Sequence, residues 1–106
     1  MAENDLNDTN LYICEVLQIL GSKWTHTVMK ELLNGPTRFN QLQRNTSIIR
    51  TQSLRDTLRH LESHGLVNRE VFPTVPVSVE YTLTEKGIDF YAALKEMEKW
   101  VLKYRE

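Results

Sequence analysis

The sequence is poor in the residues that support special chemistry or membrane insertion. Its one cysteine, Cys14, excludes an internal disulfide and leaves a zinc site without most of its usual sulfur ligands. No apolar run approaches the ~20 residues that a membrane-spanning helix needs. The first ten residues, MAENDLNDTN, are polar and acidic, unlike a signal or transit peptide. We therefore expect a cytoplasmic protein with no membrane segment, no metal and no cofactor.

Net charge is also low, because 13 Lys and Arg face 14 Asp and Glu, for a sum of -1. That balance alone argues against a nucleic-acid-binding protein, but the distribution of the charged residues along the chain reverses the argument. Residues 1–15 contain acidic side chains and no Lys or Arg, whereas residues 37–69 are rich in arginine and contain only Asp56 and Glu62 as acids. The arginines are Arg38, Arg44, Arg50, Arg55, Arg59 and Arg69. Such a segment indicates either a surface that meets phosphate or a solvated face of weak salt bridges.

A chain of 106 residues is expected to form one small domain, here residues 11–106 after a flexible stretch at 1–10. Apolar periodicity and capping residues predict helices at 11–20, 23–34, 41–44, 51–64 and from 85 onward. Asn10, Asn40 (with Gln43) and Thr84 are the expected N-caps, and either Ser47 or Thr51 caps the fourth helix. Gly65 is expected to end the fourth helix, with Leu66 packing back on it as a Schellman-type contact. Alternating residues at 66–72 and 79–83 predict a hairpin with a proline-rich loop. The fold class is mainly α with a small hairpin (α+β).

The predicted helix at 51–64 has two distinct faces. Leu54, Leu58 and Leu61 follow at i, i+4 and i+7, so this stripe should pack on the domain. The opposite side presents Gln52, Asp56 and Arg59, with Thr51 and Arg55 at its flank.

The last helix shows a heptad pattern in addition to its helical period. The residues spaced 4, 3, 4 and 3 apart are Phe90, Leu94, Met97, Val101 and Tyr104. Trp100 lies off this seam, and the first helix, with Leu11 and Ile13, is apolar nearly all round. These surfaces predict a homodimer joined through residues 11–20 and 85–104, with packing inside the same chain as the alternative.

The order of elements predicts a winged helix-turn-helix, with the two-helix motif at 40–64 and the wing at 66–83. The helix at 51–64 would lie in the major groove of double-stranded DNA. The expected base contacts are Thr51, Gln52, Ser53, Arg55 and Arg59, and the expected phosphate contacts are Arg38, Arg44, Arg50 and Lys23. Asp56 either pairs with Arg59 or Arg55 and orients it, or accepts a hydrogen bond from a cytosine amine.

The segments CEVLQILGSKWTHTVMKELLNGPTRFNQLQR and SLRDTLRHLESHGLVNREVFPTVPVSVEYTLTEKG, with the helix after them, resemble the HxlR-type winged helix-turn-helix transcriptional regulators, relatives of the MarR group. The resemblance covers about residues 14–106. It implies a bacterial or archaeal cytoplasmic regulator that dimerises through its first and last helices and binds a pseudo-palindromic operator. The sequence departs from the family pattern in two places. Val77-Ser78 stands where a Pro-Arg pair is frequent, and Arg50 where serine often caps the helix.

The resemblance also implies a role for Cys14 in sensing electrophiles or oxidants. An expected position in the first turn of a helix favours a reactive thiolate, but the neighbouring Glu15 opposes it. The alternative is a small apolar residue packed at a dimer interface. The candidate effector is a small molecule or an oxidant.

A winged-helix module for protein–protein contact, without DNA, is the alternative to a regulator. A Cys-His hydrolase would need a Gly-rich nucleophile turn, which the sequence lacks, so we expect no enzyme. His60 and His64 have a zinc-compatible spacing but no third ligand, and His26 is expected to be exposed or capping.

Overall fold

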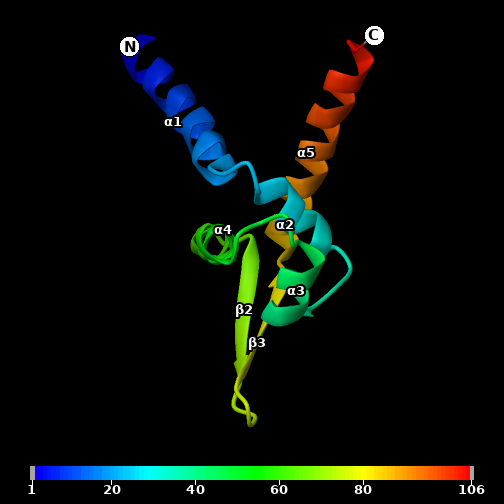
Figure 1. Ribbon diagram of the computed structural model, residues 1–106. Helices are drawn as coiled ribbons and strands as arrows, with labels where there is room; N and C mark the ends of the chain where they lie inside the picture. Colours follow the sequence, from blue (N-terminus) through cyan, green and yellow to red (C-terminus); the bar gives the residue numbers. More distant parts are fainter. Residues whose placement is uncertain (1, 106) are drawn as a thin grey trace.

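The computed structural model describes the backbone of residues 2–105 and the burial of residues 11–105. It has the predicted α+β architecture, shown in Figure 1. The elements in chain order are α1 (Ala2–Leu20), α2 (Thr25–Leu32), β1 (Thr37–Arg38), α3 (Phe39–Asn45), α4 (Thr51–Ser63), β2 (Val67–Phe72), β3 (Ser78–Leu83) and α5 (Glu85–Lys103). In the part of the chain so described, no helix is both long and apolar enough to cross a membrane.

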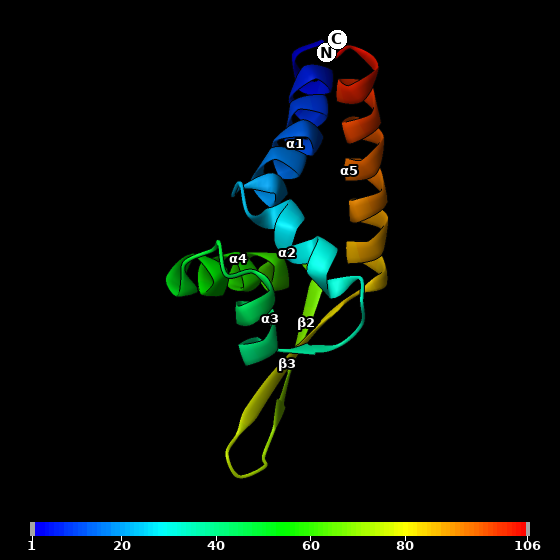
Figure 2. The same ribbon diagram turned by 45° about the vertical axis from the view of Figure 1, so that its right-hand side comes forward.

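The three strands form one antiparallel sheet in the order β1-β3-β2. The predicted hairpin is confirmed, because β2 and β3 pair from Val67 opposite Leu83 to Phe72 opposite Ser78. Its tip, residues 73–77, extends away from the body on the side opposite to α1 and α5 (Figures 1 and 2).

The core lies where α2, α4 and the sheet meet. The leucine stripe of α4 is fully buried, as predicted, with Leu54, Leu58 and Leu61 at 0–1% exposure. In α2 the buried side chains are Thr25, Val28, Met29 and Leu32. Leu33 is exposed, because the i, i+3, i+4, i+7 stripe that begins at Thr25 ends at Leu32.

A single turn fixes the end of α4 to the hairpin and to α5. Gly65 has a φ of +77°, and the Leu66 N–H donates to the Leu61 carbonyl at 2.9 Å, which is the predicted Schellman arrangement. Thr84 caps α5, as predicted, by accepting from the Gly87 N–H at 3.0 Å. The same Thr84 hydroxyl donates to the Gly65 carbonyl at 2.6 Å.

Several helix starts differ from the prediction. The start expected at Asn10 is wrong, since α1 begins at Ala2 and no glycine or proline interrupts residues 2–20. α3 begins at Phe39, which places Asn40 inside the helix. The N-cap positions of α3 and α4 are Arg38 and Arg50, neither of which makes a side-chain capping hydrogen bond. Extended backbone at these two arginines, rather than a capping side chain, sets where each helix begins.

α1 and α5 project from the body as two arms whose free ends lie far from the hairpin tip (Figures 1 and 2). Residues 11–18 of α1 are exposed, including Leu11 at 65%. On α5, Phe90 and Leu94 pack partly against the core, whereas Met97, Val101 and Tyr104 are exposed by 44–67%. Packing inside the chain therefore accounts for only the first two positions of the heptad seam.

Candidate nucleic-acid interface

The face of α4 that points away from the core is open to solvent. Of its expected base-contacting residues, Thr51, Gln52, Arg55 and Arg59 are exposed and Ser53 is partly buried. The leucine stripe holds the opposite side of the helix on the domain. α4 can thus approach a partner over its whole outward side without rearrangement of the core.

Thr51, at the start of α4, is tied to α3. The side-chain amide of Gln43 donates to the Thr51 hydroxyl. This bond links the two helices of the helix-turn-helix on their exposed side. From the sequence, Gln43 was expected only to support the cap at Asn40, and the eight-residue separation gave no signal of this contact.

Arg55 is held by an aromatic ring from the neighbouring element. Its guanidinium carbon lies 4.8 Å from the centre of the Phe39 ring, a cation–π contact. Phe39 in turn lies against Tyr81 of β3, with ring centres 6.5 Å apart. The sheet therefore positions Arg55 through Phe39.

Asp56 does not pair with an arginine, so that prediction is wrong. Its Oδ1 accepts from Gln52 Nε2 at 2.9 Å, one helical turn back. The i, i+4 spacing brings these two side chains together, while Arg55 is drawn toward Phe39. The expected bond from a cytosine amine to Asp56 stays a prediction.

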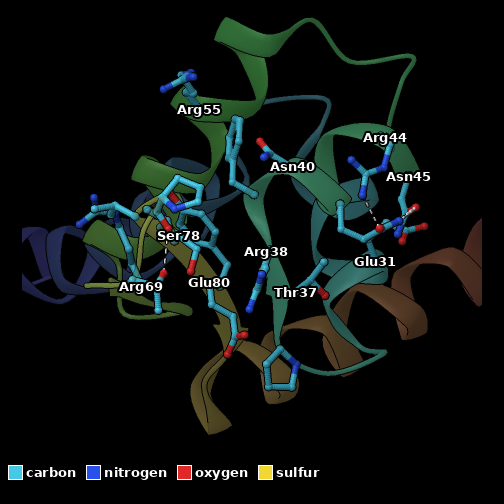
Figure 3. Close-up of a pocket in the computed structure, with 18 of the residues that line it drawn as sticks. Glu31, Thr37, Arg38, Asn40, Arg44, Asn45, Arg55, Arg69, Ser78 and Glu80 are labelled. Carbon is cyan, nitrogen blue, oxygen red and sulfur yellow. Dashed lines mark hydrogen bonds between the residues drawn. The ribbon is translucent and has the colours of Figure 1, made fainter. Parts of the chain in front are cut away.

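A groove of about 1390 Å³ lies between the helix-turn-helix and the hairpin. Its lining includes five of the six arginines from the middle of the chain, namely Arg38, Arg44, Arg55, Arg59 and Arg69. Figure 3 shows Arg38, Arg44, Arg55 and Arg69 around it, each from a different part of the chain. Glu31, Glu62 and Glu80 also line the groove.

Among the residues whose side chains the structure describes, none of these arginines forms an ion pair. Among the described residues the ion pairs are Lys95–Glu98 and Lys99–Glu96, both on α5. There the hydrogen bond that Lys95 donates lowers the pKa of the Glu98 carboxyl and raises that of Lys95 itself. Arg44 instead donates to the neutral side chain of Gln41 at 2.7 Å, so its charge is not neutralised by that contact.

Two of the predicted phosphate contacts lie outside this groove. Arg50 lines a smaller depression with Ser47 and Ile49. Lys23 lies before α2, with its amine 4.8 Å from the centre of the Trp24 ring. Conversely, Arg69 is not among the predicted contacts, although its place on β2 opposite Tyr81 brings it into the groove.

The tip of the hairpin contributes no positive charge, since residues 73–77 contain neither Lys nor Arg. Val75 and Val77 are exposed there, and the Thr74 hydroxyl donates to the Pro76 carbonyl at 2.8 Å. The arginine of the hairpin is Arg69, on β2 rather than at the tip.

Cys14 and the histidines have surroundings that differ from those expected. Cys14 is exposed, but it lies more than three turns into α1, so the helix-dipole argument for its reactivity fails.

His60 Nε2 lies 2.6 Å from the Gln18 carbonyl oxygen of α1. His26 is neither exposed nor capping, and it stacks on Tyr91 of α5 with ring centres 5.3 Å apart. Over the described ranges, no group of three or more His, Cys, Asp and Glu is arranged to hold a metal ion.

These elements define a winged helix-turn-helix protein: α3 and α4 form the two-helix motif, and β2 and β3 form the wing. The chain belongs to the HxlR-like helix-turn-helix family, whose sequence pattern matches residues 19–106. Members of this family are transcriptional regulators, which agrees with the expectation that the chain is not an enzyme.

The similar proteins come from both archaea and bacteria. An uncharacterized HTH-type transcriptional regulator of Methanothermobacter thermautotrophicus is 40% identical over 104 residues, 95% of this chain and 79% of that protein. The transcriptional regulator YodB of Bacillus subtilis is 36% identical over 88 residues, 83% of this chain and 79% of YodB.

Solved structures share the fold. The reduced form of YodB superposes with a TM-score of 0.77 at 35% identity, covering 87% of this chain and 90% of that chain. The redox regulator HypR in its oxidized form superposes with a TM-score of 0.74 at 34% identity, covering 89% of this chain and 97% of that chain.

Proposed function

We propose that this transcriptional regulator is a homodimer that binds a pseudo-palindromic DNA operator with α4 in the major groove. The main observation in support is that the exposed side of α4 lies beside a groove lined by arginines, which form no ion pair within the described residues. Guanidinium groups bind phosphate and guanine in bidentate fashion, so this surface suits duplex DNA. Since its target would be the chromosome, we place the protein in the cytoplasm.

The contacts divide into two roles. Side chains in the first turns of α4, namely Thr51, Gln52, Ser53 and Arg55, would read base edges, and Arg59 would contact a base or a phosphate. Arg38 and Arg44 on the α3 side would bind phosphate, together with Arg50 and Lys23 outside the groove. Phosphate contacts fix position and register, whereas base contacts give sequence preference.

Dimerisation would place two copies of α4 on one face of the duplex. The exposed apolar residues of both arms, such as Leu11, Ile13, Met97 and Val101, provide a surface that a second copy would bury. Two half-sites about one helical turn apart, roughly 34 Å, are the spacing that such a dimer reads.

Salt dependence tests the proposal against a protein-contact module. Four phosphate contacts per protomer make eight per dimer, so log K should fall with log salt with a slope of about -7, at ~0.9 per phosphate. Selection of bound fragments from random DNA supplies the operator for this titration, and a symmetric motif is the expected product. A flat salt curve with no enriched motif would favour the module that binds protein instead.

A response to oxidants through Cys14 is a further part of the proposal. The sulfur-bearing side chain is exposed on α1, and similar solved proteins include a redox regulator in its oxidized form. Because α1 is proposed to form the dimer, a modification there would change the distance between the two copies of α4.

A further inference from the structure

Gln52 and Asp56 form a hydrogen-bonded pair on the outward side of α4. Both side chains are exposed, and Gln52 Nε2 donates to Asp56 Oδ1 at 2.9 Å. The pair lies on the surface that would face DNA, and neither residue belongs to the core. Its effect therefore falls on the partner of α4 rather than on the packing of the domain.

The chemistry of Asp56 decides which way the Gln52 amide points. An ionised carboxylate only accepts hydrogen bonds, so the atom beside it must be the amide nitrogen. The flipped amide would place Oε1 against a carboxylate oxygen, which is repulsive. Without Asp56 the terminal torsion of glutamine is broad, and both orientations are accessible.

The oriented amide keeps the groups that adenine needs. A primary amide has two N–H groups, and Asp56 uses one of them. The other N–H and Oε1 remain as an adjacent donor and acceptor. Adenine presents the matching N7 acceptor and N6 donor in the major groove, whereas guanine presents two acceptors and cytosine a single donor.

We propose that Asp56 is a positioning residue that orients Gln52 to select adenine at one position of each half-site. This inference rests on the proposed DNA binding. The proposal also explains why an acidic residue lies on a surface otherwise suited to phosphate. The Asp56 carboxylate weakens binding to any DNA, but by orienting Gln52 it increases the discrimination between bases at one base pair.

Those two opposite effects make the test specific. The full-length protein is titrated against its selected operator, against operators with the adenine replaced by each other base, and against unrelated DNA. The wild-type protein is expected to prefer adenine by tenfold or more at that position, within the ~1–3 kcal/mol of a bidentate pair. Gln52→Ala should remove this preference.

Asp56→Ala should reduce the preference to below threefold while raising affinity for unrelated DNA by a few-fold. Asp56→Asn can either accept from or donate to the Gln52 amide, so it no longer fixes the orientation; it should reduce the adenine preference as Asp56→Ala does and also bind unrelated DNA more tightly than the wild type does. Alanine favours helix at an exposed position, so the variant is expected to fold, and thermal unfolding verifies this.

Glu62→Ala is the matched control, because it removes a carboxylate from the same helix and leaves the Gln52–Asp56 pair intact. It should raise affinity for unrelated DNA without altering the base preference. If Asp56→Ala keeps the full adenine preference, or loses affinity for all sequences equally, the positioning role is wrong. A wild-type protein that binds no DNA would overturn the proposed function itself, which is a different result.

Discussion

Individual arginines of the interface differ in what surrounds them, and this difference predicts different roles. Arg55, on α4, lies over the ring of Phe39. Arg44, on α3, donates a hydrogen bond to Gln41. Arg55 is thus held beside the turns of α4 that would enter the major groove. Arg44 lies on the α3 side, where the phosphate backbone of the bound DNA would pass.

Arg55→Ala should relax base preference at one position by ~1–3 kcal/mol, because a lost base contact removes discrimination. Arg44→Ala should weaken binding to all sequences alike and reduce the salt slope by about one unit per protomer. Fluorescence anisotropy with the selected operator and with unrelated DNA measures both effects. Equal losses in the two variants would show that the assignment of roles is wrong.

Cys14→Ser tests the oxidant response at a single atom. Serine is nearly isosteric with cysteine but does not react with a thiol oxidant, so operator affinity should become independent of diamide. The wild-type protein treated in parallel should lose or gain affinity on oxidation. Identical responses of the two proteins would remove Cys14 from the mechanism.

At the scale of elements, close approaches between chain segments set how α4, the hairpin and α5 meet. Gly87 on α5 lies against the Leu66 backbone, and a Cβ built on Gly87 would stand 2.1 Å from the Leu66 carbonyl oxygen. Only a residue without a side chain allows α5 to start there.

Gly87→Ala should therefore lower the free energy of unfolding by at least ~1–3 kcal/mol, the usual range for overpacking, since the clash is with backbone. Chemical denaturation measures the change. Asp89→Ala, an exposed substitution one half-turn further along α5, is the control and should stay within ~0.5 kcal/mol of the wild type. Comparable stability of both variants would mean that α5 can shift away from Leu66.

The contact between α1 and α4 connects the proposed dimer arm to the proposed reading helix. His60 Nε2 lies 2.6 Å from the Gln18 carbonyl, which accepts only, so Nε2 carries the proton. The Ser22 and Thr57 hydroxyl oxygens, 3.5 Å apart, form a second contact between the α1–α2 turn and α4.

His60→Leu should reduce the dependence of affinity on half-site spacing, because the arm then has more freedom relative to α4. Operators lengthened by one base pair, compared with the selected one, measure this penalty. His60→Gln keeps an N–H donor and should behave as the wild-type protein does. A spacing penalty that is the same in all three proteins would contradict a coupling through His60.

At the scale of the whole molecule, the body and the two arms differ in how they are stabilised. The body encloses the buried leucines of α4 and the sheet, while the arms leave large apolar side chains in water. Exposed apolar surface of this kind marks an interface, and a second copy of the chain is the occupant proposed above.

Met97→Glu should shift the protein toward a monomer, because a charge would be buried where a methionine packs. Sedimentation velocity over a concentration range measures this shift, and operator affinity should fall with it. Lys99→Glu also introduces a negative charge on α5 but lies on another side of the helix, so the dimer should persist. A Met97→Glu protein that remains a dimer would place the interface elsewhere.

Local pattern in the sequence was enough to predict the order of elements. Leucines at helical spacing, the glycine at position 65, the cap at Thr84 and two alternating stretches each act over a few residues. Such short-range preferences also located the outward side of α4, because a helix that buries one stripe must expose the other. They failed at the start of α3, where the extended backbone of Arg38 rather than a capping side chain marks the boundary, and at the start of α1, which begins at Ala2 rather than at Asn10.

Contacts between distant segments came only from the tertiary structure. No spacing rule joins Gln43 to Thr51, Phe39 to Arg55 or His26 to Tyr91. The sequence by itself thus determined which elements form and which face of α4 is polar, since periodicity repeats along a single helix or strand. Only packing decided that Arg69 joins the groove and Arg50 does not, and that Arg55 lies over Phe39 rather than beside Asp56, because these outcomes depend on where separate elements meet.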